Sequence, residues 1–127
     1  MRDPSDPTVA AAIPRARGRA ARLQGLLDAA QAGRVTMGAG VIESNAVIIG
    51  TSEPRAYLRA EVREQVVAEG ETVADGLGHA ESNIVGYAGV ALLAVGAGRP
   101  ICEGCEGKIV SVKAVPASEC RSGKVYA

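Results

Sequence analysis

Residues 78–105 read GHAESNIVGYAGVALLAVGAGRPICEGC, and this stretch decides the fold. It predicts a helix over about residues 79–89, followed by a short apolar run at residues 90–95 that is typical of a buried strand. Residues 96–100 are expected to form a loop, and a second helix is expected from Cys102 to about residue 114. A helix, a buried strand and a second helix in succession indicate an α/β arrangement.

The residues before this stretch extend the same pattern. A helix is expected over residues 14–32, with Pro14 in its first turn. Strands are expected over residues 35–42 and 46–51, paired as an antiparallel hairpin, and residues 52–78 as a long irregular connection. The apolar face of the first helix consists of Ala20, Leu23, Leu26 and Leu27. The predicted fold class is therefore α/β, a three-layer α/β/α sandwich with a mixed central sheet.

Length and composition set the size of the core. The chain has 127 residues, of which 47% are apolar, and this suits one compact domain. Because Phe and Trp are both absent, the core is expected to consist of Val, Ile, Leu and Ala. We expect residues 1–12 to form a disordered leader and residues 13–127 to form the single domain.

The charge pattern bears on the partners of the protein. The formal net charge is zero, which does not indicate a strongly basic nucleic-acid-binding domain. Four arginines, Arg15, Arg17, Arg19 and Arg22, are consistent either with a solvated helix face or with a stripe that contacts phosphates. No apolar run has the length of a membrane span, and no secretory signal is present, so we expect no membrane partner and action in the cytoplasm.

Three side chains predict a zinc site. His79 is the only histidine, and Cys102 and Cys105 are two residues apart at the start of an expected helix. Backbone N–H groups and the helix dipole favour thiolates at that position. A catalytic zinc takes three protein ligands and keeps its fourth position for water. His79, Cys102 and Cys105 would complete this set if the starts of the two helices converge.

Glu81, two residues beyond His79, is the expected catalytic residue. A carboxylate there would lie near the zinc without binding it. It could take a proton from the zinc-bound water, whose pKa the metal lowers, and deliver it to a ring nitrogen and a leaving amine. The expected reaction is hydrolytic deamination at an amidine-like ring carbon, which is C4 of cytosine or C6 of adenine.

These residues resemble the pattern of the cytidine-deaminase-like superfamily, His-x-Glu followed by Pro-Cys-x-x-Cys. Here the pattern is His79-Ala80-Glu81 and then Pro100-Ile101-Cys102-Glu103-Gly104-Cys105, with Ile101 as an insertion. Within that superfamily, residues 50–59, 78–81 and 99–102 look most like the deaminase domains of bacterial polymorphic toxins. The resemblance implies Zn²⁺ as cofactor and cytosine in DNA or RNA as substrate. It also implies delivery into a target bacterial cell as part of a larger toxin, and an immunity protein as a possible partner.

Four residues are expected to bind the substrate: Asn45, Ser52, Tyr57 and Ala80. Asn45 is either a turn residue or an amide at the pocket rim, as in related deaminases. Ser52 is either a turn former or a rim residue. Tyr57 either packs in the core or stacks on a base. Ala80 lies inside the His-x-Glu pattern.

Other functions stay open at this point. The same chemistry could act on a free nucleoside or base of the cytidine, adenosine or guanine type. The Cys-x-x-Cys could also be a redox pair. A non-catalytic zinc module is a further alternative, in which Cys120 would supply a fourth ligand and close the site. Otherwise Cys120 is expected to be a surface or tail thiol.

Overall fold

The computed structural model describes residues 1–126, so Ala127, the last residue of the expected domain, lies outside the described residues. Two short 3₁₀ turns, η1 (Pro54–Ala56) and η2 (Gly89–Ala91), accompany the regular elements. The helices are α1 (Pro7–Gln24), α2 (Ala29–Ala32), α3 (Ala60–Ala68), α4 (Ala80–Ala88) and α5 (Glu103–Ser111). The strands are β1 (Met37–Ile42), β2 (Val47–Thr51), β3 (Thr72–Val73), β4 (Leu92–Ala97) and β5 (Val115–Pro116).

The sheet is mixed and has the strand order β3-β2-β1-β4-β5. Strand β1 runs antiparallel to both neighbours, and the outer pairs β2/β3 and β4/β5 are parallel. The predicted hairpin of the first two strands is thus confirmed. Met37 pairs with Thr51 in β2, and Gly38 pairs with Ala97 in β4. The start of β1 therefore lies between the ends of β2 and β4.

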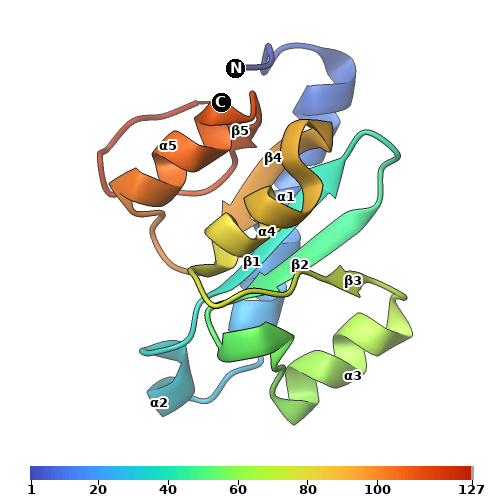
Figure 1. The fold of residues 1–127 in the computed structure, drawn as a ribbon, viewed down its shortest axis with the longest axis vertical. Helices are drawn as coiled ribbons and strands as arrows, with labels where there is room; N and C mark the ends of the chain where they lie inside the picture. The colour runs from blue at the N-terminus through green and yellow to red at the C-terminus, as the bar shows by residue number, and fades with distance from the viewer. Residues whose placement is uncertain (127) are drawn as a thin grey trace.

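Helices cover both faces of the sheet, which confirms the predicted three-layer α/β/α class. Figure 1 shows α4 and α5 in front of the sheet and α1 behind it. Two separate apolar clusters fill the spaces between the layers. Residues of α1 and α3 belong to one, and residues of α4 and α5 belong to the other. Among residues 1–126, no helix combines the length and the apolar character needed to cross a bilayer.

The N-terminal prediction was wrong, because residues 7–12 belong to α1 and not to a disordered leader. The Asp6 side chain accepts hydrogen bonds from the first turn, and Pro7 occupies a position that favours helix initiation. Pro14 consequently lies inside the helix instead of in its first turn. Burial of Val9 and Ile13 against the sheet offsets the hydrogen bond that Pro14 cannot donate.

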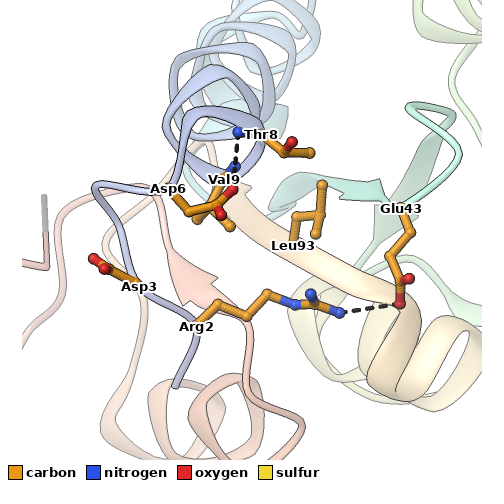
Figure 2. A pocket seen from close by; sticks show the side chains of 7 residues that line it. All are labelled: Arg2, Asp3, Asp6, Thr8, Val9, Glu43 and Leu93. Atoms are coloured by element: carbon orange, nitrogen blue, oxygen red, sulfur yellow. Dashed lines mark hydrogen bonds and ion pairs between the residues drawn. The ribbon is translucent and has the colours of Figure 1, made fainter.

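Residues before α1 are attached to the domain as well. The guanidinium of Arg2 donates to the carbonyls of Leu92 at 3.0 Å and Val90 at 2.9 Å, and it pairs with Glu43 at 3.1 Å. Figure 2 shows this ion pair across a hollow that also contains Asp6 and its hydrogen bonds to the start of α1. The chain therefore joins the domain from Arg2 onward.

The connection over residues 52–78 contains more regular structure than expected. It includes helix α3 and the two-residue strand β3. Val62 and Val66 of α3 are buried, so a short apolar stripe is sufficient to seat this helix. At the C-terminus, the two-residue strand β5 follows α5, and an isolated bridge pairs Ile101 with Cys120.

Candidate metal centre and its cavity

The three expected metal ligands come from the starts of two neighbouring helices. His79 is the N-cap residue of α4, Cys102 is the N-cap residue of α5, and Cys105 lies in the first turn of α5. Figure 1 shows the two helices side by side, running in the same direction, with their starts at the same end of the sheet. The expected convergence of the helix starts is confirmed.

The distances between these side chains fit a metal site. His79 Nδ1 lies 3.3 Å from Cys105 Sγ and 3.6 Å from Cys102 Sγ, and the three donor atoms lie within 4.8 Å of one another. Tetrahedral zinc, with Zn–N near 2.05 Å and Zn–S near 2.3 Å, requires an N···S separation of about 3.6 Å. One imidazole nitrogen and two sulfurs at this spacing could bind a metal ion.

Burial and hydrogen bonds set the state of the Cys105 thiol. Burial raises the pKa of Cys105 to about 11, although a hydrogen bond with Ser82 opposes this change. The Ser82 hydroxyl lies 3.4 Å from Cys105 Sγ and accepts from Lys108 Nζ at 3.3 Å. A metal ion that binds here must displace the thiol proton. Once the thiolate has formed, Ser82 can donate to it and orient it.

Glu81 faces the same cavity as the possible ligands. Its side chain is buried, with the residue 3% exposed, and it lines a cavity of about 250 Å³ together with His79 and Cys102. Burial raises the pKa of the Glu81 carboxyl, against smaller opposing effects of its own backbone N–H, His79 and Arg121. A raised pKa brings a carboxyl closer to neutral pH, where it can exchange a proton.

Two glycines of the sheet allow α4 to approach closely and so place His79 and Glu81. A Cβ atom built at Gly50 would lie 2.8 Å from Cγ1 of Ile84 and closer still to the carbonyl oxygen of Ala80. A Cβ at Gly40 would lie 2.7 Å from Cγ2 of Ile84. Side chains at these strand positions would push the helix away from the sheet.

Asn83 attaches the start of α4 to the end of β2. This residue is buried, and its amide donates to the carbonyls of Thr51 at 3.1 Å and Gly78 at 3.2 Å. The Asn83 Oδ1 atom accepts from the Gly78 N–H at 3.2 Å. The loop immediately before His79 is therefore held by a side chain that the sequence reading did not single out.

Of the four expected substrate-binding residues, only Ser52 lines this cavity. Its hydroxyl also accepts from the Thr36 N–H at 2.8 Å, so it joins the entry to β1 with the exit from β2. Ala80 is the first residue of α4 and is fully buried, with its carbonyl against Gly50 of the sheet. Tyr57 is 51% exposed, and its ring lies 5.5 Å from the guanidinium carbon of Arg59, outside the cavity lining.

The expectation that Asn45 lies at the pocket rim was wrong. Asn45 has a φ of 71° in the turn between β1 and β2, and its side chain and carbonyl accept from Arg15. The antiparallel register puts this turn at the opposite end of the hairpin from Ser52. At about 3.3 Å per residue, the separation along β2 is about 20 Å. The turn-residue alternative describes Asn45 correctly.

Four cavity residues were not anticipated: Arg34, Thr36, Arg99 and Arg121. Arg99 directly precedes the Pro-x-Cys-x-x-Cys run, so its position in the sequence was a usable signal. Arg121 reaches the cavity only because residues 119–121 pair with Ile101, and no local pattern announces that contact.

Cys120 does not join the possible ligand group among the described residues. It is buried in the apolar cluster of α4 and α5, and its Sγ contacts the carbonyl of Ser118 at 3.6 Å. The expectation of a surface thiol was therefore wrong. Burial raises the pKa of Cys120 to about 11, so this thiol stays protonated.

Comparison of the chain with protein-family models, with curated proteins and with solved structures gave no match.

Proposed function

We propose that this protein is a zinc-dependent hydrolase that deaminates cytosine to uracil in DNA or RNA. The observation that carries the proposal is the position of Glu81. The buried carboxyl of Glu81 lines one small cavity together with the His79 imidazole and the Cys102 thiol, and these two groups and the buried Cys105 thiol have the spacing of a metal-ligand set. An acid in that place has a role in proton transfer but no evident role in packing.

In this proposal His79, Cys102 and Cys105 hold Zn²⁺. A bound zinc would supply a water molecule that ionises near neutral pH. Glu81 would accept a proton from that water, pass it to the ring nitrogen N3, and assist departure of the amine from C4. Water adds and ammonia leaves, so the reaction needs no oxidant and no second cofactor. The narrow cavity suits a single base that has left its stack.

Ser82 and Asn83 serve this chemistry as positioning residues. Ser82 contacts Cys105 and would orient its thiolate toward the metal. Asn83 holds Gly78 and Thr51, so it keeps His79 at the start of α4 beside the end of β2. Both residues lie on α4, so this helix and its N-cap residue supply the ligand His79, the acid Glu81 and the two positioning residues.

Two alternatives from other functional classes have less support. A closed structural zinc site would require a fourth protein ligand, and Cys120 is not part of the described ligand group. A redox Cys-x-x-Cys pair would not explain why His79 contacts both thiols or why a buried acid lines the same cavity as His79 and Cys102. A deaminase of free nucleosides or bases remains the second candidate, and the cavity volume is compatible with it.

The proposal is tested by zinc content and product formation together. The zinc-loaded protein is incubated with single-stranded and double-stranded DNA and with RNA, and C-to-U conversion is read by sequencing. The Glu81→Gln variant should keep one zinc per chain and lose conversion by at least about 100-fold. Glu103→Gln is the matched control, because Glu103 is an exposed acid beside Cys102. Conversion that survives in Glu81→Gln would remove this acid from the mechanism.

The biological role that we propose is that of a bacterial toxin domain. Its activity on nucleic acid would be harmful inside a cell, and a dedicated immunity protein would protect the producer by covering the cavity. Growth arrest on expression of the wild type, but not of Glu81→Gln, is the expected result. Equal growth of the two strains, with equal protein levels, would contradict this role.

A further inference from the structure

Three arginines surround the cavity that contains Glu81. Arg34, Arg99 and Arg121 all line it, and they come from three separate parts of the chain. Arg34 precedes β1, Arg99 follows β4, and Arg121 lies in the C-terminal segment. Three arginines and one buried acid therefore line a single small space. This concentration is unexpected in a chain whose net charge is zero.

Backbone contacts bring two of these arginines together. The N–H of Arg121 donates to the carbonyl of Ile101 at 2.8 Å, and the N–H of Ile101 donates to the carbonyl of Glu119 at 2.9 Å. This pairing places Arg121 beside the loop that carries Arg99 and the first cysteine of the metal-ligand group. Burial of Ile101 holds the pairing in place.

Arg34 reaches the cavity from the segment that leads into β1. Its Nε donates to the carbonyl of Ala30 at 3.3 Å, and Thr36, two residues later, is joined to Ser52 by backbone and hydroxyl hydrogen bonds. Arg34 therefore stands before the start of β1, whereas Arg99 and Arg121 stand beside the end of β4, and the start of β1 lies between the ends of β2 and β4. Three segments that are far apart in the sequence thus contribute an arginine to one cavity.

The three cavity arginines differ from several other arginines of the protein in having no carboxylate partner among residues 1–126. Within residues 1–126, carboxylates pair with Arg2, Arg19 and Arg59, and none lies within 4.0 Å of a nitrogen of Arg34, Arg99 or Arg121. The ion pair of Arg19 with Glu71 is nearly buried. Arg15 is also engaged, by Asn45. Two of the four arginines that could have formed a phosphate-contacting stripe on α1 are thus engaged in contacts inside the protein, whereas no carboxylate pairs with the cavity arginines among residues 1–126.

We propose that Arg34, Arg99 and Arg121 bind phosphate groups of the substrate and thereby select phosphate esters of cytidine or deoxycytidine over the free nucleosides. Guanidinium groups match phosphate oxygens in charge and in bidentate geometry. The base would enter toward Glu81 while the flanking phosphates stay at the mouth of the cavity. This inference rests on the proposed function for the identity of the base, but the phosphate contacts are a separate property. Phosphodiesters of a nucleic-acid strand are the favoured source, because three cations around one opening can contact successive phosphates.

Binding and turnover test the proposal independently. The binding probe is a fluorescein-labelled oligo-deoxythymidine with a single central deoxycytidine, measured by anisotropy with the zinc-loaded protein. Each of Arg34→Gln, Arg99→Gln and Arg121→Gln should weaken binding by about 10- to 100-fold. The slope of log K against log salt should fall in magnitude by about 0.7 for each lost phosphate contact. Arg99→Lys keeps the charge without the bidentate fork and should give an intermediate loss.

Arg63→Gln is the matched control, because Arg63 is exposed on α3 and does not line the cavity. Equal affinities and equal salt slopes for this control and the three cavity variants would overturn the proposal. That outcome would leave the deaminase assignment intact if deoxycytidine is still converted. Conversely, weakened binding in the cavity variants, with no conversion of any substrate, would support the phosphate contacts and refute the deaminase assignment.

Turnover of three substrates distinguishes the sources of phosphate. The oligonucleotide, deoxycytidine 5′-monophosphate and deoxycytidine are compared by ammonia release. A kcat/KM that is highest for the oligonucleotide, and falls most for it in the cavity variants, supports the nucleic-acid source. Preference for the monophosphate supports the phosphate contacts but assigns them to a free nucleotide. Preference for deoxycytidine in the wild type refutes the proposal.

Discussion

Replacement of Gly50 by alanine tests how the sheet places the candidate metal centre. Gly50 is the penultimate residue of β2 and lies beneath α4, and this helix begins next to His79 and contains Glu81. An added Cβ would meet Cγ1 of Ile84 at 2.8 Å and would approach the carbonyl oxygen of Ala80 more closely. The backbone contact cannot be relieved by a change of rotamer, so α4 itself must move.

The size of that movement follows from the contact distances. Ordinary van der Waals contact begins near 3.4 Å, so the contact with Ile84 alone requires a shift of at least 0.6 Å. Metal–ligand distances tolerate only about 0.2 Å. We therefore expect zinc affinity to fall by about 10- to 100-fold. Overpacking should also cost about 1–3 kcal/mol of unfolding free energy, which corresponds to a decrease in Tm of about 4–12 °C.

Zinc affinity is measured by competition with a chromophoric chelator, and Tm by circular dichroism of the metal-free protein. Gly86→Ala is the control, since Gly86 is exposed in the same helix and its added Cβ would meet nothing within 4 Å. That change should leave zinc affinity unaltered and increase stability by about 0.5–1 kcal/mol. If Gly50→Ala binds zinc as tightly as Gly86→Ala does, the close approach of α4 does not determine the ligand geometry.

Three other predictions follow from contacts near the site. Cys120→Ser should keep one zinc per chain by elemental analysis, and loss of the metal would support a four-ligand structural site. Ser82→Ala should weaken zinc binding by about 10-fold in the chelator competition, because Cys105 loses its hydrogen bond; unchanged affinity would remove Ser82 from the metal site. The hydrogen bond that Tyr126 donates to Glu106 raises the pKa of Tyr126 to about 12. The same bond, together with one from Ser122, lowers the pKa of Glu106. The contact should therefore stabilise the protein most between about pH 5 and pH 10, where Glu106 is ionised and Tyr126 is protonated. This stabilisation should weaken as acid protonates Glu106 and as alkali ionises Tyr126. When tyrosine ionisation is followed by phenolate absorbance, the step near pH 12 should be absent in Tyr126→Phe. A step that persists in this variant would show that another tyrosine produces it.

The succession of elements was largely readable from local patterns. The hairpin of β1 and β2, the buried strand β4 and the helices that follow His79 and Cys102 were all predicted, because apolar runs and turn residues report local structure directly. The limits of α1 were less accessible. Pro14 suggested a helix start, but the Asp6 cap and the burial of Val9 extend the helix seven residues upstream, to Pro7.

The glycines of the hairpin show a similar limit. Sequence periodicity gives no reason for glycine at positions 40 and 50. The reason is the close packing of α4 on both residues, which leaves no space for a Cβ atom. Asn45 shows the reverse case. Its place between two strands was predicted, but the direction of the hairpin decides whether that turn adjoins the cavity, and the register places it at the far end.

By itself, the sequence determined the chemistry that is available: one imidazole, a pair of thiols two residues apart, and an acid two residues from the imidazole. Spacing along a helix start is a local property, so these groups were recognisable without coordinates. Only the tertiary structure decided which other groups accompany them. Arg34, Arg99 and Arg121 are far apart in the chain and meet because strand ends and a C-terminal bridge converge on one cavity. Packing of distant segments, which local periodicity does not encode, therefore determines which arginines line the cavity.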